Sequence, residues 1–420
     1  MKKQVVPSEY SGIIAIPSSK SDGQRALLAA ALAKGTSRLK NVGPSADEQS
    51  MLQAIRSLGA QIVDVGENTL EITGIAEFPT EIYLNLNESG LGSRLLTAVL
   101  AAHRGHFTLD GSGSLKERPM SFWVETLPQF GAKCEASAGK LPLTITGPMQ
   151  GNTVGIDGSL SSQFLSGLLM ALPLISTESR LLVKGLNSTP YVQMTLDTLA
   201  KFGIAVSHQQ YEQFVIAGNQ HYLSTDYTVE GDWSSASYWL VAAALGQDIA
   251  VTGLSLASLQ ADKYLLQVFE KAQCILEFKG ESIHVNGENR VPFEVDATHC
   301  PDLFPALVCL AAFTPGISTI HGLTRLKHKE SDRGQTLQSE FGKLGIEIVL
   351  TGNVMHVHGQ VHVSGGEVSA HNDHRIAMCL AIAGMFTESA VVIDGAEAVE
   401  KSYPAFWQDL AGLELNDFED

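Results

Sequence analysis

Apolar and polar positions along this chain form two kinds of helical segment. Residues 26–32 are Ala and Leu alone, and a helix that is apolar all round is expected to be buried. Residues 53–57 mix Gln and Arg with Ala and Ile, which predicts a helix with one face in water. Short apolar runs such as residues 249–252 and 391–393 predict strands between the helices.

A recurring sequence motif divides the chain into six units of about 70 residues. In each unit an apolar residue precedes Gly or Ala at the end of a helix, and a strand follows. The clear copies carry Gly59, Gly131, Gly203 and Gly345. The first three glycines stand 72 residues apart, and the last gap is 142 residues, or twice 71. Degenerate copies are therefore expected at residues 271–273 and 410–412.

Each unit also has a characteristic first half. It opens with a polar turn rich in Gly or Ser, continues into an apolar helix, and reaches a strand. The openings are residues 18–25, 88–94, 159–163, 231–236, 299–302 and 371–375. A second helix and a hairpin follow, and the hairpin is clearest at residues 61–73, with its turn at residues 66–68. With the preceding strand, the unit is a β-α-β-α-β-β module.

Six modules predict an α/β (α+β) protein of two lobes with three repeats in each. We expect the N-terminal lobe to span residues 17–227, and the C-terminal lobe to combine residues 1–16 with residues 228–420. The first strand, at residues 5–16, is assigned to the C-terminal lobe. A cleft between two lobes is the expected place for a ligand.

Composition narrows the class of protein. With 420 residues, 44% of them hydrophobic and 17% charged, the chain is expected to fold into more than one domain. A formal net charge of −17 argues against a nucleic-acid partner, because phosphate backbones require a basic face. It does not exclude small anions, since a few cations can dominate the potential of a cleft.

The chain shows no sign of a membrane or secreted protein. It has no apolar stretch of the roughly 18 residues that a membrane span needs, and no signal-peptide pattern. The five cysteines lack C-x-x-C spacing, so reduced thiols are expected. We therefore expect a cytoplasmic protein.

The six openings are candidate anion sites. A helix N-terminus presents unpaired N–H groups and the positive end of its dipole. The first opening adds Lys20, Ser21 and Arg25, which supply an ammonium, a hydroxyl and a guanidinium group. The alternative is a helix cap with solvated charges, which is the commoner meaning of one such turn taken alone.

Several segments of the chain resemble a known family, that of 5-enolpyruvylshikimate-3-phosphate (EPSP) synthases. The resemblance begins with residues 19–35 and continues in family order along essentially the whole chain. The other matching segments are Ser89-Gly90 with Arg94, residues 116–120, residues 161–165, Pro190-Tyr191, residues 230–238, Pro301-Asp302, residues 329–333, residues 372–378 and residues 401–404. The family's six-fold repeat of β-α-β-α-β-β units agrees with the repeat described above.

The resemblance implies a transferase. Its members move the enolpyruvyl group of phosphoenolpyruvate (PEP) to the 5-hydroxyl of shikimate 3-phosphate and release phosphate, by addition and elimination through a tetrahedral intermediate. This step belongs to the shikimate pathway to chorismate and aromatic amino acids. The implied protein needs no cofactor and no metal, acts as a monomer, and closes its two lobes around the ligands.

The resemblance also assigns roles to residues. Asp302 is implied as the base on the 5-hydroxyl, and Glu330 as the group that protonates the PEP methylene, with Lys20 as a competing donor. The dense cations should keep both carboxylates ionised unless burial raises one pKa. The implied PEP site consists of Lys20, Gly90, Arg118, Gln163, Arg333, Arg375 and Lys401. The implied shikimate 3-phosphate site consists of Lys20, Ser21, Arg25, Ser161, Ser162, Gln163, Ser188, Tyr191, Asp302 and Lys329.

Other interpretations of these residues stay open. Asp302 could be a helix cap, Glu330 a capping-region carboxylate, and His374 either a ligand contact or a buried support. The related transferase that acts on UDP-N-acetylglucosamine usually has Lys-Asn at the first opening and a Cys in a mobile loop. This chain has Ser21 and no Cys in residues 111–118. A non-catalytic anion-binding protein on the same scaffold is a further alternative.

The chain departs from the family's commonest pattern at three places. Gly23-Gln24 stands where Ser-Asn is usual, Glu88 replaces an amide near the PEP site, and Arg325 stands where an Asn often helps to hold the shikimate ligand. Gly90 predicts sensitivity to glyphosate, the family's PEP-competitive inhibitor. The histidines His356, His358 and His362 are expected on one strand, as a solvated edge more than a metal site.

Overall fold

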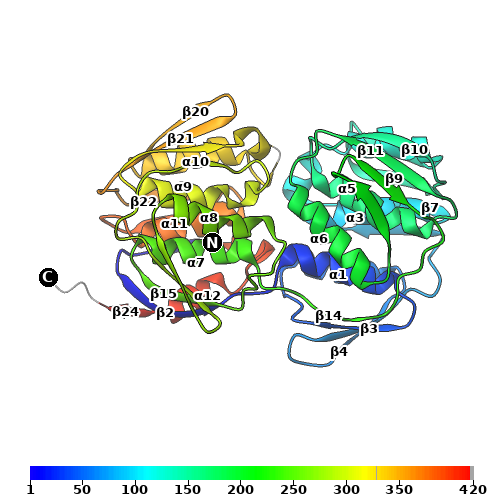
Figure 1. Ribbon diagram of the computed structural model, residues 1–420, viewed down its shortest axis with the longest axis horizontal. Helices are drawn as coiled ribbons and strands as arrows, with labels where there is room; N and C mark the ends of the chain where they lie inside the picture. Colours follow the sequence, from blue (N-terminus) through cyan, green and yellow to red (C-terminus); the bar gives the residue numbers. More distant parts are fainter. Residues whose placement is uncertain (328, 417–420) are drawn as a thin grey trace. The chain divides into compact units, whose positions relative to one another are not determined.

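The computed structural model describes residues 1–327 and 329–416, and over these residues the strands form six sheets (Figure 1). Internal contacts divide the chain into two compact units. The N-terminal unit is Ser18–Glu230, and the C-terminal unit consists of Met1–Pro17 and the chain from Gly231 onward. Each unit contains three of the six sheets.

One sheet pattern recurs in both units. A strand pairs in parallel with the next strand of its repeat, and that strand pairs antiparallel with one arm of a hairpin, as in the order β6-β7-β9-β8. A helix links the two parallel strands because a parallel connection must cross over the sheet. The β-α-β-α-β-β module expected from the repeat is therefore confirmed.

The strands of the N-terminal unit form the orders β14-β3-β5-β4, β6-β7-β9-β8 and β10-β11-β13-β12. They are β3 (Thr36–Lys40), β4 (Gln61–Asp64), β5 (Leu70–Thr73), β6 (Glu81–Asn85), β7 (Gly105–Asp110), β8 (Lys133–Ser137), β9 (Lys140–Gly147), β10 (Thr153–Asp157), β11 (Ser179–Lys184), β12 (Val206–Gln209), β13 (Gln213–Ile216) and β14 (Asp226–Thr228). The expected hairpin at residues 61–73 is formed by β4 and β5.

The strands of the C-terminal unit form the orders β16-β17-β15-β2-β24, β18-β19-β21-β20 and β1-β23-β22. They are β1 (Lys2–Val5), β2 (Glu9–Ala15), β15 (Asp248–Thr252), β16 (Ile275–Lys279), β17 (Ser282–Asn286), β18 (Glu294–Asp296), β19 (Gly316–His321), β20 (Glu347–Thr351), β21 (Val354–Gly359), β22 (Gly366–Ser369), β23 (Val391–Asp394) and β24 (Glu414–Asn416).

The single first strand expected at residues 5–16 is wrong. The segment forms two strands in two different sheets: β1 pairs with β23, and β2 pairs with β15. Pro7 lies between them, and proline cannot donate a backbone hydrogen bond to a sheet. The chain's beginning thus completes two sheets that the last three repeats leave unfinished.

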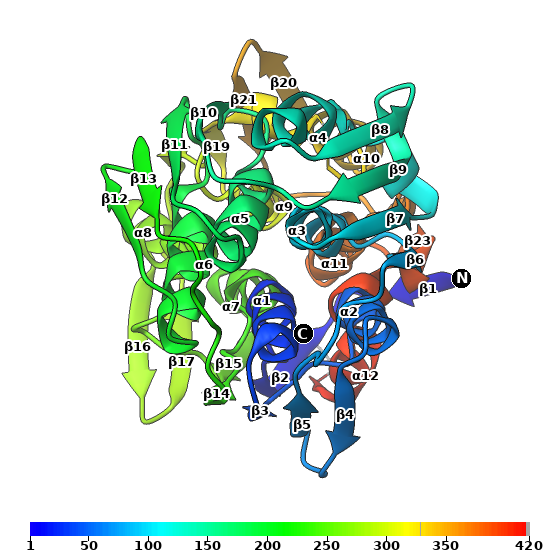
Figure 2. The same ribbon diagram turned by 90° about the vertical axis from the view of Figure 1, so that its right-hand side faces the viewer.

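The first helix of each repeat is buried, as its apolar sequence predicts. In the N-terminal unit these helices are α1 (Lys20–Leu32), α3 (Gly90–Ala102) and α5 (Ser162–Ala171), and the unit's sheets lie around them (Figure 2). In the C-terminal unit they are α7 (Trp233–Leu245), α9 (Phe304–Ala312), preceded by the short helix η5 (Pro301–Leu303), and α11 (His374–Gly384). All six expected openings lie at helix starts.

The second helices are half exposed, and a residue with positive φ follows all but the last of them. They are α2 (Ala46–Ser57), α4 (Ser121–Thr126) with η2 (Leu127–Phe130), α6 (Thr189–Lys201), η4 (Ala261–Tyr264) with α8 (Leu265–Lys271), α10 (Arg333–Lys343), and η7 (Ala396–Lys401) with α12 (Phe406–Gly412). Gly59, Gly131, Gly203 and Gly345 have φ between 79° and 107°, which a residue without Cβ adopts readily.

The two degenerate copies of this ending differ from the expectation. In the fourth repeat the left-handed position is taken by Gln273, at φ 60°, and not by its neighbour Ala272. In the sixth repeat Gly412 lies inside α12, and the cap residue Leu413 is extended. The described residues contain no helix long and apolar enough to cross a membrane.

Candidate functional site

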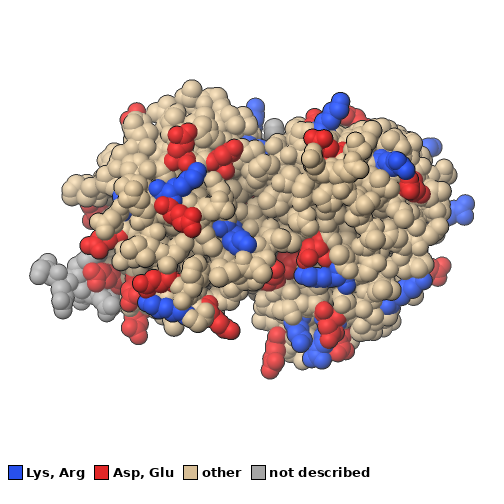
Figure 3. Space-filling model, viewed as in Figure 1, with Lys and Arg blue, Asp and Glu red and all other residues tan. Residues whose placement is uncertain are grey.

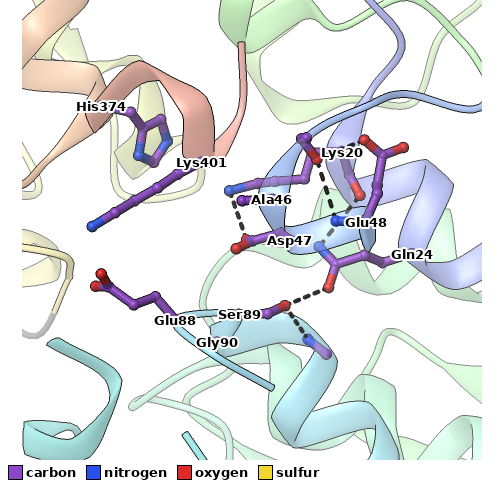
Figure 4. Close-up of polar contacts among 12 residues, drawn as sticks. Lys20, Gln24, Ala46, Asp47, Glu48, Glu88, Ser89, Gly90, His374 and Lys401 are labelled. Carbon is purple, nitrogen blue, oxygen red and sulfur yellow. Dashed lines mark hydrogen bonds and ion pairs between the residues drawn. The ribbon is translucent and has the colours of Figure 1, made fainter. Parts of the chain in front are cut away.

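The start of α1 carries the first group of candidate residues. Ser19 caps the helix, so Lys20 and Ser21 stand in its first turn. The Nζ atom of Lys20 lies 3.0 Å from Oδ2 of Asp47, at the start of α2 (Figure 4). Both side chains are mostly buried, so this ion pair is partly shielded from water. Sequence reasoning had not named Asp47.

Arg25 is buried one turn further along α1. Its Nε donates to Oγ1 of Thr195 at 2.8 Å, and its Nη2 donates to the carbonyl of Tyr191 at 3.1 Å, both on α6. Its Nη1 donates to the carbonyl of Ser21 at 2.7 Å. Burial lowers the pKa of Arg25 to about 10, and nearby Asp22 opposes that shift, so the guanidinium remains charged at neutral pH. The structure thus brings Ser21, Arg25 and Tyr191 together.

The start of α3 holds Gly90 beside two guanidinium groups. A Cβ added at Gly90 would lie 2.5 Å from Nη1 of Arg118 and 3.0 Å from Nη1 of Arg94. Arg118 follows the short helix η1 (Gly113–Glu117) and is 7% exposed. Only a residue without a side chain fits here while both arginines keep these positions. Gly90 and Arg118 of the implied PEP site are therefore neighbours.

Arg94 also connects Gly90 to the start of α5. Its Nη1 donates to the carbonyl of Gly90 at 3.1 Å and to Oε1 of Gln163 at 2.7 Å. Its guanidinium lies 4.9 Å from the ring centre of Phe164, a distance at which a cation is attracted to an aromatic face. Arg94 belonged to the family signature but had no assigned role, and the structure makes it the partner of Gln163.

Besides Ser21 on α1, the serines of the implied shikimate 3-phosphate site lie at two further helix starts. Ser161 caps α5, its Oγ accepting from the amide of Gln163 at 3.3 Å, and Ser162 is buried in the first turn. Ser188 caps α6 with φ 58°, and its carbonyl accepts from the amide of Tyr191 at 3.1 Å. Both starts expose N–H groups suited to an anion.

The departures at the first opening have partners. The carboxylate of Glu48 occupies the space that a side chain at Gly23 would need. Oε1 of Gln24 accepts a hydrogen bond from Oγ of Ser89, which caps α3 (Figure 4). The differences from the family's commonest pattern are therefore built into the packing of this chain.

The C-terminal unit concentrates its candidate residues around Arg333, the first residue of α10. Its Nε donates to Oδ2 of Asp373 at 2.8 Å, and its Nη2 donates to Oδ1 of the same carboxylate at 3.2 Å. Nη1 donates to Asp302 at 2.7 Å, and Nη2 also donates to Glu330 at 2.6 Å. The side chain of Arg333 is 0% exposed. One buried guanidinium therefore holds both carboxylates that the family resemblance makes catalytic.

Asp302 is surrounded by cations. Oδ1 contacts Arg333 and accepts from Nζ of Lys329 at 3.1 Å, and Oδ2 lies 3.3 Å from Nη2 of Arg375. Burial disfavours the ionised form, but Arg375, Lys329 and Arg333 outweigh it and hold the pKa of this carboxyl well below its usual range. The expectation that Asp302 stays ionised is therefore confirmed. Burial lowers the pKa of Lys329, with Asp302 opposing the shift.

The turn before α11 contacts two further candidates, which are Arg375 in the first turn of α11 and Lys401 at the end of η7. Asp373 caps α11 and accepts from the amide of Arg375 at 3.0 Å. Nζ of Lys401 donates to the carbonyl of Asn372 at 2.6 Å, so the end of η7 is tied to this turn. His374, which sequence reasoning left ambiguous, is 1% exposed.

Arg325 lies in η6 (Leu323–Leu326), between β19 and α10, and is half buried. Burial lowers the pKa of its guanidinium, and Asp302 opposes that shift. The residue that replaces the usual Asn is thus within the electrostatic influence of Asp302.

The three histidines of the proposed strand edge do not share one strand. His356 and His358 lie on β21 as expected, but His362 lies beyond its end. His358 is 3.7 Å from Glu347, and His362 is 2.9 Å from Glu388, so each of these two histidines has one acidic neighbour. Over residues 1–327 and 329–416, no group of three or more His, Cys, Asp or Glu residues could hold a metal ion.

One face of the surface carries mixed charges, and one pocket lies apart from the candidate residues. On the face drawn in Figure 3, acidic and basic side chains are interspersed. An open pocket of about 630 Å³ lies beside β15 and β17 in the C-terminal unit and contains none of the candidate residues. Its Gln247 is bonded to the backbone of Tyr10 and Ser8, and its Arg290 to the carbonyl of Phe313.

Sequence reasoning missed the partners that hold the candidate cations. Asp47 pairs with Lys20 across 27 positions of sequence, and Thr195 binds Arg25 across 170. Asp373 was present in a quoted motif, and its place before an apolar helix was a cap signal that could have singled it out.

Comparisons with known proteins agree with this arrangement. A family model described as EPSP synthase (3-phosphoshikimate 1-carboxyvinyltransferase) matches residues 6–410. A 3-phosphoshikimate 1-carboxyvinyltransferase of Clostridium kluyveri is 37% identical, covering 97% of this chain and 96% of the relative. One of Colwellia psychrerythraea is also 37% identical, covering 96% of this chain and 97% of the relative.

Solved structures show the same fold. An EPSP synthase of Acinetobacter baumannii superposes with a TM-score of 0.82 at 25% identity, covering 99% of this chain and 100% of the other. The enolpyruvyl transferase NikO of Streptomyces tendae gives a TM-score of 0.78 at 18% identity, covering 98% of each chain, a likeness of fold alone.

Proposed function

Since the chain belongs to the EPSP synthase family, we propose that it transfers the enolpyruvyl group of PEP to the 5-hydroxyl of shikimate 3-phosphate. The observation that carries this proposal is the pair of carboxylates, Asp302 and Glu330, held by one buried guanidinium, Arg333. A reaction that moves one proton from an oxygen and another to a carbon needs two such groups. The alternatives, transfer to UDP-N-acetylglucosamine and binding without catalysis, are not favoured by the relatives.

The substrates bring phosphates and carboxylates, and the candidate residues bring the matching cations. In this proposal Arg333 and Arg375 bind the carboxylate of PEP, and its phosphate is bound by Lys20, Arg118, Gln163 and Lys401. Shikimate 3-phosphate is bound by the residues at the starts of α1, α5 and α6 together with Asp302 and Lys329.

Asp302 is proposed as the base. Its pKa is low because Arg375, Lys329 and Arg333 surround it, despite its burial. When the PEP carboxylate takes over contacts with Arg333 and Arg375, Asp302 loses part of that stabilisation and its pKa rises. It then accepts the proton of the 5-hydroxyl as the oxygen attacks C2 of PEP. Binding of PEP thereby prepares the base.

Glu330 is proposed to enter this addition in its protonated form and to give that proton to C3 of PEP, with Lys20 as the competing donor. The product of addition is a tetrahedral ketal that carries a methyl group and the phosphate. Removal of a proton from that methyl group by the same residue re-forms the double bond, and the phosphate leaves with the proton that Asp302 took from the 5-hydroxyl. Atoms balance without a metal or cofactor, and positioning with electrostatics lowers the barrier.

We further propose that the chain acts in the cytoplasm as a monomer. For the cytoplasm the support is five cysteines that are all free and buried, as a reducing compartment allows. The monomer is what the family resemblance implies. Light scattering at micromolar concentration tests the monomer, and a mass of twice 45.0 kDa would refute it.

The test of the function is phosphate release from the purified protein mixed with PEP and shikimate 3-phosphate. Lys20→Ala and Glu330→Ala are expected to reduce the rate by about 100-fold or more, the usual contribution of an acid–base group. Lys34→Ala and Glu347→Ala, at exposed positions, serve as matched controls. Folded protein that releases no phosphate when both substrates are present would refute the proposal.

A further inference from the structure

Glu88, which replaces the amide usual at its position, binds a segment far along the chain. Its Oε2 accepts hydrogen bonds from the amide of Ser114 at 3.1 Å and from Oγ of Ser114 at 3.0 Å. Glu88 directly precedes Ser89, the cap of α3, while Ser114 lies in the first turn of η1. The carboxylate therefore joins the start of α3 to the start of η1.

This link continues the pairing of β6 with β7 beyond the ends of the two strands. The amide of Leu86 donates to the carbonyl of Asp110 at 3.0 Å, and the amide of Ser112 donates to the carbonyl of Asn87 at 2.7 Å. The contact between Glu88 and Ser114 is the next rung, supplied by a side chain. Arg118 directly follows η1, so this contact fixes the start of the short helix that leads to Arg118.

The backbone around Glu88 is matched to its carboxylate. Gly113 has φ 50°, and a Cβ there would lie 2.5 Å from the carboxyl carbon of Glu88. Glycine at this position suits the left-handed conformation and leaves free the space that the Glu88 carboxylate fills. The arrangement is a built contact and not a chance approach of a surface side chain.

The same serine also reaches Arg118. Its Oγ lies 3.5 Å from Nη2 of Arg118, a long hydrogen bond, while Nη1 of Arg118 lies close to Gly90. Glu88, Ser114 and Arg118 thus form a chain of contacts that returns to the first turn of α3. A carboxylate oxygen can accept from both donors of Ser114 at once, which restricts the rotation of its hydroxyl.

We propose that Glu88 is a positioning residue that holds η1 and, through Ser114, orients Arg118 beside Gly90. The inference rests on the proposed function, in which Arg118 binds the phosphate of PEP. A shorter Asn side chain at position 88 lacks a methylene group, so the added length of Glu is what reaches Ser114. In this proposal the carboxylate of Glu88 serves to bind Ser114 and does not contact PEP.

The experiment combines steady-state kinetics with hydrogen exchange of the ligand-free protein. Glu88→Ala is expected to raise the KM for PEP about tenfold, while kcat and the KM for shikimate 3-phosphate change by less than about twofold, because two hydrogen bonds that orient Arg118 are lost. Glu88→Gln keeps an oxygen acceptor for Ser114 and should restore the KM for PEP to within about threefold of the wild-type value. The amide of Ser114 should exchange faster in Glu88→Ala than in the wild-type protein.

Ser114→Ala and the double variant test whether Glu88 acts through Ser114. Ser114→Ala should resemble Glu88→Ala, and combining the two should add little to the KM for PEP. Glu117→Ala, in the same turn but 75% exposed and paired with Lys140, is the matched control and should leave the KM unchanged.

The outcomes separate this inference from the proposed function. An unchanged KM for PEP in Glu88→Ala, additive effects in the double variant, or a Glu88→Gln variant as impaired as Glu88→Ala would each overturn it. If the wild-type protein releases no phosphate, the proposed function fails. Independently of that result, an unchanged rate of hydrogen exchange at the Ser114 amide in Glu88→Ala would show that Glu88 does not hold Ser114. Should Glu88→Ala fail to fold, Ser114→Ala carries the same comparison.

Discussion

The hydroxyl of Ser89 donates a hydrogen bond of 2.7 Å to Oε1 of Gln24, and both side chains are fully buried. The same hydroxyl accepts from the amide of Gly92 at 3.2 Å and so caps α3. Nε2 of Gln24 donates to the carbonyl of Lys20 at 3.4 Å. This pair joins the first turns of α1 and α3, which present Lys20 and Gly90.

Gln24→Leu is expected to lower the free energy of unfolding by about 1–3 kcal/mol, because it leaves the buried hydroxyl of Ser89 without its acceptor. Ser89→Ala loses the cap as well, at a cost of about 1 kcal/mol. Since each variant removes the same contact, the double variant should lose less than the sum. Urea unfolding measures all three, with exposed Gln53→Leu on α2 as the control. Strict additivity would contradict the coupling.

Gly90→Ala is expected to weaken binding of both PEP and glyphosate. The new Cβ would meet Nη1 of Arg118 at 2.5 Å and of Arg94 at 3.0 Å, so both guanidinium groups must move. A shift of this kind should raise the KM for PEP and the glyphosate inhibition constant by about tenfold, equivalent to about 1.4 kcal/mol. Gly342→Ala, where a Cβ meets open space, is the control. Unchanged constants in Gly90→Ala would show that Arg118 does not contribute to either site.

Asp302 and Asp262 are expected to change the free energy of unfolding with pH in opposite directions. Despite burial, the cations Arg375, Lys329 and Arg333 keep the pKa of Asp302 below that of an unfolded chain, so its ionised form stabilises the fold above about pH 4. This contribution is lost as the pH falls through the folded value. Asp302→Asn should therefore cost roughly 3 kcal/mol at pH 7 and progressively less in acid.

Burial instead raises the pKa of Asp262 to about 7, with Arg375 opposing the shift. The folded protein then holds a proton that the unfolded chain releases, so its stability falls as the pH rises from about 4 to about 7. Asp262→Asn should remove this decline, so the stability of the variant relative to the wild-type protein should increase as the pH rises over that range. Urea unfolding at pH 4 to 8 measures both variants. Parallel pH profiles of the two would contradict the assignment.

The repeat and its buried helices could be predicted because their signals are local. Residues 26–32 are apolar on every side, and a left-handed helix end favours glycine, which occupies it at Gly59, Gly131, Gly203 and Gly345. The split of the first strand was also signalled, because Pro7 interrupts the run and proline cannot donate a backbone hydrogen bond to a sheet.

The contacts of the site could not be predicted in the same way. Asp47 is, in sequence, an ordinary acid in the first turn of α2, and nothing near it indicates that Lys20 is its partner. The fit of Glu48 over Gly23 likewise depends on how α1 packs against α2. Pairing of this kind is decided by packing between elements, which a single sequence does not encode as a pattern.

The helix end after α10 allows a direct test of the repeat. Gly345 has φ 88°, and a Cβ at this position would meet no atom within 4 Å, so Gly345→Ala introduces backbone strain without a clash. The fourth repeat places Gln273, with φ 60°, at the equivalent helix end. A side chain in the left-handed region costs about 1–2 kcal/mol.

Gly345→Ala is therefore expected to lower the free energy of unfolding by about 1 kcal/mol, and Gln273→Gly to raise it by about 0.5–1 kcal/mol, since it relieves strain already present. The gain is the smaller change because glycine also increases the freedom of the unfolded chain. Gly342→Ala, in the last turn of α10, controls for the loss of glycine alone and should not destabilise the protein. Urea unfolding measures all three. Destabilisation by Gln273→Gly would mean that the side chain of Gln273 contributes more to the fold than its backbone conformation costs.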